Sequence, residues 1–137
     1  MGIEIITDKE QQLAIIVYND FNKEGIHFFT KNDLSQQLAY MSHPKGKTIE
    51  PHVHNPVERV VSYTQEVLFI KEGKLKVDFY TNDQIYLESR ELSKGDVVLL
   101  MTGGHGFEVL EDLKMFEVKQ GPYAGDQDKT RFTPLKS

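Results

Sequence analysis

Cysteine is absent from this chain of 137 residues, which excludes disulfides, thiolate metal ligands and cysteine nucleophiles. Basic residues are in the minority: Lys and Arg number 16 against 21 Asp and Glu, so the formal net charge is −5. That balance argues against binding of nucleic acid or of an anionic membrane, because both need a basic surface. A local basic pocket for an anionic ligand is still compatible with it.

Long apolar runs are also missing. No run approaches the ~20 residues that a membrane-spanning helix needs. The first residues, MGIEIITDKEQQ, carry acids and lack a basic segment followed by an apolar one, so we expect no signal peptide. A chain of this size can bury roughly two thirds of its unfolded surface. The expectation is therefore a soluble, cytoplasmic protein with one domain.

Short apolar or alternating segments fill most of the chain, and they are rich in Val, Ile, Tyr and Phe, which is typical of strands. They are Ile3–Ile6, Leu13–Tyr18, Ile26–Phe29, Leu38–Met41, Pro51–His54, Val57–Tyr63, Val67–Ile70, Leu75–Tyr80, Ile85–Leu87, Val97–Met101, Phe107–Leu110 and Met115–Lys119.

The clearest alternation follows Gly73, where Leu75, Val77 and Phe79 share one parity. Such a period of two indicates a half-buried strand. Asn82-Asp83 predicts a hairpin turn, and Glu111-Asp112 predicts another turn between two strands. Signals for helices are scarce. The sequence therefore predicts an all-β sandwich or barrel.

A pair of histidines, His52 and His54, is the first candidate for chemistry among the five histidines of the chain. On a strand, residues two apart face the same side, with Cα atoms about 6.5 Å apart. Two imidazoles at that spacing can converge on one ion, at about 2.0–2.1 Å each. A surface pair on a polar strand is the alternative reading of the same spacing.

The context of this pair is a recognisable pattern. Gly46 is followed after five residues by His52-Val53-His54, and Glu66 is followed after six residues by Gly73. The arrangement resembles the first motif of the cupin superfamily, which reads G, five residues, HxH, three or four residues, E, six residues, G. The stretches TQEVLFIKEGKLKVDFY, LSKGDVVLLMTGGHGFEVLED and EVKQGPY resemble small, single-domain cupins encoded with sugar-nucleotide and polysaccharide biosynthesis functions.

A second cupin-like motif follows with departures. Gly95, five residues, Met101-Thr102-Gly103 and then His105 resemble G, five residues, PxG, two residues, H, three residues, N. Met101 replaces the proline and the histidine comes one residue early. A slip by one residue turns a strand residue to the other face, although consecutive glycines can absorb it in a bulge.

The glutamate of the first motif has two candidates. Eleven residues separate His54 from Glu66, whereas Glu58 lies four after His54. No glycine lies seven after Glu58, because that position is Gln65. We therefore assign the motif to Glu66, treat residues 55–65 as an enlarged loop, and keep Glu58 as the alternative.

The resemblance implies a double-stranded β-helix, the cupin or jelly-roll barrel, as a single domain over residues 1–137. The motif core spans about 46–118, with extra N-terminal strands at 3–29 and a tail at 121–137. It also implies a metal site formed by His52, His54, Glu66 and His105. Imidazole and carboxylate ligands suit a divalent transition metal such as Zn, Fe, Mn, Ni or Co. The expected partner is a small molecule.

Lining residues and the oligomeric state are predicted less directly. Tyr63, Met101 and Phe107 are candidates for a substrate pocket, although core packing is the more common role of aromatic and methionine side chains. His27 and His43 are not expected to be ligands. The N-terminal strands exceed what the motif core needs, and such strands often pair between subunits, so we expect a homodimer.

Three functions are compatible with these residues and motifs. The first is a metal-dependent enzyme acting on a small molecule, such as a sugar derivative, with undefined activity. The second is a non-catalytic module that binds a sugar or small acid. The third is a metal-free nucleotide-sugar isomerase or epimerase, in which histidine and tyrosine transfer protons.

Overall fold

The computed structural model describes residues 2–134 and consists of two compact units. Asn22–Tyr63 forms the smaller unit, and the remaining described residues form the larger one. Strands dominate, and the one helical segment in the described part of the chain is the four-residue 3-10 turn η1, Gly125–Asp128. The expectation of an almost entirely β protein is confirmed at this level.

The larger unit contains one sheet of six strands, in which β1, β2, β7, β5 and β6 lie side by side and β8 pairs with β5. The bounds are β1 Ile3–Asp8, β2 Gln11–Val17, β5 Glu66–Tyr80, β6 Tyr86–Ser93, β7 Val97–Leu100 and β8 Gly104–Lys119. All the pairings that link these strands are antiparallel. The smaller unit contains the hairpin of β3, Gly25–Phe28, and β4, Ala39–Ser42.

The alternation that predicted a strand after Gly73 has the expected effect in β5. Leu75, Val77 and Phe79 are buried, whereas Lys74 and Lys76 are more exposed. The buried set joins apolar side chains from the other strands in one core. This core contains Ile6, Leu13, Ala14, Ile16, Leu68, Ile70, Leu75, Val77, Phe79, Leu92, Val98 and Leu100.

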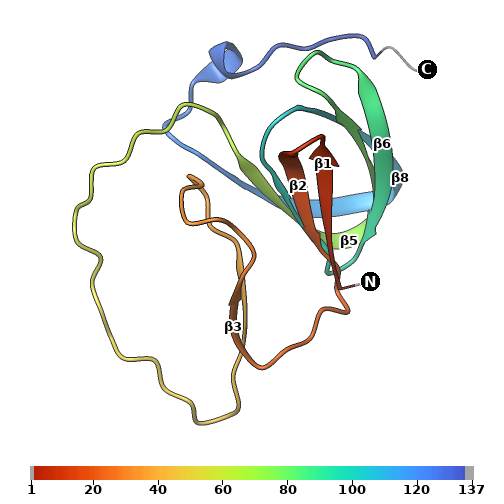
Figure 1. The fold of residues 1–137 in the computed structure, drawn as a ribbon. Helices are drawn as coiled ribbons and strands as arrows, with labels where there is room; N and C mark the ends of the chain where they lie inside the picture. The colour runs from red at the N-terminus through yellow and green to blue at the C-terminus, as the bar shows by residue number, and fades with distance from the viewer. Residues whose placement is uncertain (1, 135–137) are drawn as a thin grey trace. The chain divides into compact units, whose positions relative to one another are not determined.

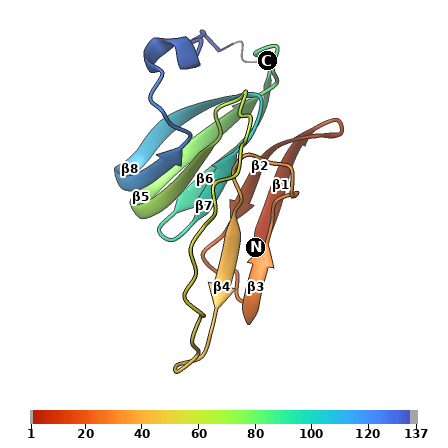
Figure 2. The ribbon, with the colours of Figure 1, turned by 90° about the vertical axis from the view of Figure 1, so that its left-hand side faces the viewer.

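The long strands β5 and β8 form a curled antiparallel ribbon (Figures 1 and 2). Its register shifts near Gly73, between Ile70 and Leu75. Gly73 has a φ of 94°, and a Cβ there would lie 2.0 Å from the backbone oxygen of Asp112. Only glycine tolerates both conditions. The ribbon therefore bends at this irregularity, while β5 and β8 each continue through it as a single strand.

This continuity corrects one prediction from the sequence. Glu111-Asp112 does not form a turn between two strands, because β8 runs through both residues as a single strand. The acidic pair instead lies opposite the Gly73 irregularity of β5. A bulge and a turn share polar residues and a break in alternation, so the sequence pattern alone did not separate them. The predicted turn at Asn82-Asp83 is confirmed by hydrogen bonds that join Thr81 and Ile85.

Two predicted strands are absent. Pro51–His54 and Val57–Tyr63 are irregular, and the described chain contains no strand between Ser42 and Glu66. Pro51 and Pro56 lack the N–H that a central strand donates to its neighbour, and apolar spacing without a pairing partner does not make a strand.

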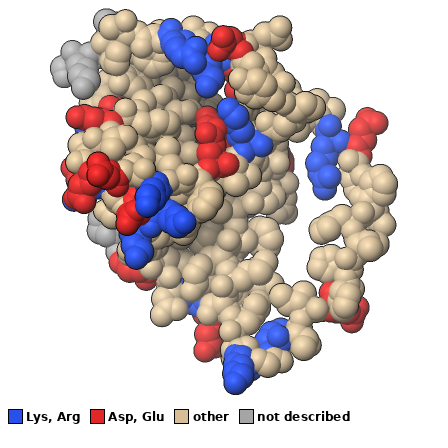
Figure 3. Space-filling view, turned by 180° about the vertical axis from the view of Figure 1, so that it is seen from behind, with Lys and Arg blue, Asp and Glu red and all other residues tan. Residues whose placement is uncertain are grey.

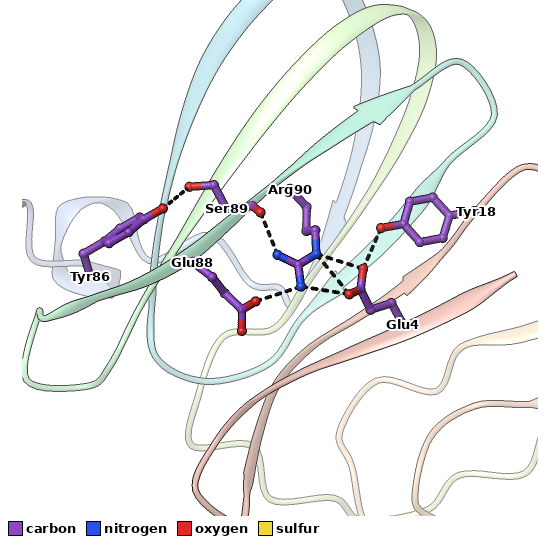
Figure 4. A network of polar contacts seen from close by, with 6 residues as sticks. All are labelled: Glu4, Tyr18, Tyr86, Glu88, Ser89 and Arg90. Atoms are coloured by element: carbon purple, nitrogen blue, oxygen red, sulfur yellow. Dashed lines mark hydrogen bonds and ion pairs between the residues drawn. The ribbon is translucent and has the colours of Figure 1, made fainter. Parts of the chain in front are cut away.

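Side chains join the two outermost strands of the β1-β2-β7-β5-β6 path (Figure 4). Arg90 of β6 donates to both carboxylate oxygens of Glu4 of β1, at 2.8 to 3.0 Å. Tyr18 donates its hydroxyl to Glu4 at 2.7 Å, and Glu88 pairs with Arg90 at 2.7 Å. Bidentate pairs of this kind are the stronger charge-assisted hydrogen bonds. They join β1 to β6, and we call the pair of Glu4 and Arg90 the clasp.

Charges elsewhere on the protein are mixed. On the face shown in Figure 3, Lys and Arg side chains lie among Asp and Glu side chains. Separately, no helix in the described part of the chain has the length and apolar character needed to cross a membrane.

Gly73→Ala should lower the free energy of unfolding by more than the ~1–3 kcal/mol of a strained backbone, because the added methyl also meets the Asp112 carbonyl. Gly46→Ala is the matched control, since Gly46 has a φ of 92° and nothing within 4 Å of a Cβ. Urea denaturation of both variants measures the difference. Equal losses would show that the close approach at Gly73 is unimportant.

Glu4→Gln should destabilise the protein at neutral pH by about 1–3 kcal/mol, as for a hydrogen bond to a charged group. The hydrogen bond from Arg90 lowers the pKa of Glu4 below its ordinary 4.5. Wild type therefore holds this contribution above pH 4.5 and loses it as pH falls through the lower folded pKa. Denaturation curves of the two proteins should converge at acid pH. Glu88→Gln, which removes a single contact to Arg90, should cost less; an equal loss would contradict the clasp.

Candidate site on the inner face of the curled sheet

One face of the β5–β8 ribbon carries the buried core, and we call it the inner face. Glu66 has the parity of the buried residue Leu68, so it lies on this face. Residues directly opposite each other on antiparallel strands share a face. Glu117 lies opposite Leu68 and Lys119 opposite Glu66, while His105 lies opposite Phe79. The inner face thus collects four polar side chains, Glu66, His105, Glu117 and Lys119.

Glu66 and His105 meet across the curl. The distance from His105 Nε2 to Glu66 Oε1 is 3.3 Å, although the β8 partner of Glu66 is Lys119 and His105 pairs with Phe79. From Glu66 to Phe79 is 79 − 66 = 13 positions, or roughly 43 Å on a straight strand. Only a ribbon that closes on itself can bring these two side chains together. The curl therefore builds the contact.

The electrostatics of this group favour an ionised Glu66. The hydrogen bond from His105 is the largest influence and, despite partial burial, lowers the pKa of Glu66 to about 2. The hydrogen bond with Glu66 raises the pKa of Glu117, to which burial also contributes. The charge of Glu117, its partner at 3.4 Å, raises the pKa of Lys119. The pKa values of Glu66 and Glu117 are thus shifted in opposite directions. Such a separation between two neighbouring carboxyls is typical of functional sites.

His52 and His54 belong to the smaller unit. They lie in an exposed irregular segment rather than on a strand, and their ring centroids are 5.2 Å apart in an edge-on arrangement. His52 Nδ1 also lies 3.0 Å from the backbone oxygen of Glu50. The two rings thus stand together, as predicted, by a local conformation that the sequence did not indicate. Glu58, the alternative ligand, is exposed in the same unit.

The described residues of neither unit contain a group of three or more His, Cys, Asp or Glu side chains placed to hold a metal ion. The larger unit supplies two of the four predicted ligands, Glu66 and His105, in contact with each other. The smaller unit supplies the other two, close to each other. The four-ligand site stays a prediction.

The predicted pocket residues have three different environments. Met101 is in the core at 7% exposure, and Tyr63 is 75% exposed in the smaller unit. Phe107 is on the inner face of β8, opposite Val77, and its ring centroid is 5.4 Å from that of His105. Phe107 therefore lies beside His105.

Glu117 was not identified from the sequence. The signal was available in the spacing Met115, Glu117, Lys119, which places all three on one face of a strand. What the sequence could not provide is the register with β5, which decides whether that face is the inner one.

Comparison of the chain with protein-family models, with curated proteins and with solved structures found no match. A function for the chain is therefore inferred from the site itself.

His105→Ala should raise the pKa of Glu66 from about 2 back toward 4.5, because the hydrogen bond from His105 is the largest cause of the lowering. Carbon-13 NMR of the Glu66 carboxyl, titrated from pH 6 down, measures the shift. His27→Ala, in the smaller unit, is the matched control and should leave the titration unchanged. A Glu66 carboxyl that titrates near 4.5 in wild type would contradict the contact.

Proposed function

We propose that the protein binds a divalent transition metal and a small molecule on the inner face of a cupin-type barrel, with Glu66, His105, His52 and His54 as ligands. The observation that carries the proposal is the meeting of Glu66 and His105 across the curled ribbon. These are two residues that the cupin-like motifs pick out independently, from positions 66 and 105 of the chain.

The geometry of this contact fits a shared ion. Two ligand atoms bound at about 2.0–2.1 Å with a tetrahedral angle between them lie roughly 3.3 Å apart. The distance from Glu66 Oε1 to His105 Nε2 is also 3.3 Å. A glutamate carboxyl is ionised at neutral pH, as a ligand must be. An imidazole, a carboxylate and the absence of thiolates suit Zn, Fe, Mn, Ni or Co.

The finer fold, a double-stranded β-helix, is part of the same proposal. Among the described residues, β8 pairs with no strand other than β5, which leaves an edge that a further strand could use. On the inner face of β8, Phe107 and Val109 are 42% and 58% exposed. The edge of β8 that no other described strand covers is the observation that favours this finer fold.

A bound metal would polarise a carbonyl or lower the pKa of a bound water. The residues of the chain contribute orientation and protons. Glu117, with its raised pKa, retains a proton more readily than Glu66 does. Lys119 supplies a positive charge beside them. The resemblance to cupins of polysaccharide biosynthesis favours a sugar derivative as the small molecule.

A metal-free function is the second candidate, and the same contact supports it. A carboxylate that orients an imidazole is the arrangement of a general base and its positioning group. In that case His105 would transfer protons to and from a sugar derivative, Glu66 would orient the His105 ring, and His52 and His54 would be dispensable. Chelators would leave such an activity intact.

Elemental analysis of untagged protein tests the first candidate. We expect close to one equivalent of a transition metal in wild type at pH 7.5. We expect loss of that metal in Glu66→Gln, in His105→Ala and in the double variant His52→Ala/His54→Ala. The bound metal should also be released as pH falls through the histidine range near about 6.5, since ligation needs neutral imidazole.

The control for this experiment is the double variant His27→Ala/His43→Ala, which removes the same number of imidazoles from the smaller unit and should keep its metal. If wild type takes up no metal after incubation with divalent ions, the metal-binding proposal fails and the metal-free function is favoured. If His52→Ala/His54→Ala keeps its metal while His105→Ala loses it, the ion is held by the larger unit alone.

A further inference from the structure

The chain beyond β8 returns to the sheet and is attached at two places. We call residues 120–132 the strap; it passes over one end of the curled ribbon and contains the turn η1 (Figures 1 and 2). Near its start, Gln120 accepts a hydrogen bond from the backbone N–H of Gln65. Asp128 accepts one from the hydroxyl of Thr64. Both partners directly precede Glu66 in the chain.

The far end of the strap is attached by an aromatic contact. Phe132 packs edge-on against Tyr80, with ring centroids 5.1 Å apart. Its ring also closely approaches Gly104: a Cβ at Gly104 would lie 3.1 Å from the Phe132 ring. Gly104 is the residue before His105, so the second attachment is adjacent to the other half of the contact.

The two attachments therefore bracket the Glu66–His105 pair. One involves the residues immediately before Glu66, and the other involves the residue immediately before His105. The electrostatic influence of Asp128 reaches Lys119 on the inner face as well. Between its attachments the strap is held weakly: η1 has no buried residue, and the ion pair of Asp126 with Arg131 is solvent-exposed.

We propose that the strap is a gate over the Glu66–His105 pair, held closed by Phe132 beside Gly104 and by Gln120 and Asp128 beside Thr64 and Gln65. A segment with few buried contacts opens locally at a small free-energy cost compared with the core. Opening frees the end of the inner face where the two side chains meet, and closing shields them from bulk solvent. The gate is independent of whether the pair binds metal or transfers protons.

Chemical modification of His105, carried out in the presence of a chelator so that no metal protects the imidazole, tests the gate without a known ligand. Diethyl pyrocarbonate acylates neutral imidazole, and mass spectrometry of the digested protein gives the rate at each histidine. Phe132→Ala should raise the rate at His105 by about 2-fold to 10-fold, because an aromatic pair of this kind shifts an opening equilibrium by that factor. The rate at the exposed His43 is the internal reference and should not change.

The matched control is Tyr123→Ala, which removes an aromatic ring from the same strap at a position that is 86% exposed. It should leave the rate at His105 at the wild-type value. If Tyr123→Ala raised the modification rate at His105 as much as Phe132→Ala does, the proposal that Phe132 holds the strap closed would be overturned.

A locked variant separates gating from a general loosening of the sheet. Because the chain has no cysteine, Thr64→Cys/Asp128→Cys introduces the only thiols, at positions whose side chains touch. Oxidation should slow modification of His105 below the wild-type rate, also in combination with Phe132→Ala, and a reductant should restore it. Equal rates in the locked, reduced and wild-type proteins, or failure of the two cysteines to pair, would overturn the proposal.

Discussion

The curl of the β5–β8 ribbon is the constraint on which the rest of the larger unit depends. A strand of 15 residues paired with one of 16 residues would be far longer than the core it has to cover if it stayed straight. The ribbon bends at the register shifts around Gly73, where the backbone of Asp112 comes too close for any side chain. From that bend follow the common core on the inner face and the approach of the sheet edges that Glu4 and Arg90 join.

The same bend explains why the polar group of the inner face is where it is. Antiparallel pairing by itself would hold Glu66 and His105 at distant points of one ribbon. Closure brings them to 3.3 Å and leaves Glu117 and Lys119 beside them. A charged cluster at the end of an apolar interior is expensive unless its members are paired. Each of the four side chains here has an oppositely charged or hydrogen-bonding neighbour, and the cluster stays partly accessible to water.

The sequence predicted the strands of the larger unit well because their apolar residues alternate and face a real core. It failed in two physical situations. At Glu111-Asp112 the alternation breaks at a bulge, which has the composition of a turn. At Pro51–His54 and Val57–Tyr63 the composition suits a strand, but a strand also needs a partner, which local patterns do not report. Glu66 and His105 were both selected as candidate ligands from their motif spacing, and the structure brings them into contact. Glu117 was missed because its face depends on the register between β5 and β8, which is a property of two strands together.

The clasp between Glu4 and Arg90 has a consequence for how the protein acquires its structure. The two residues are 86 positions apart, and Asn19 is joined to Asp96 over 77 positions. Contacts between such distant parts of a chain close large loops, and proteins dominated by them fold slowly, over milliseconds to seconds. During synthesis β1 and β2 emerge first and must wait for β6 and β7 before their apolar residues find a partner. The N-terminal hairpin is therefore the part of this protein for which early protection from aggregation matters most.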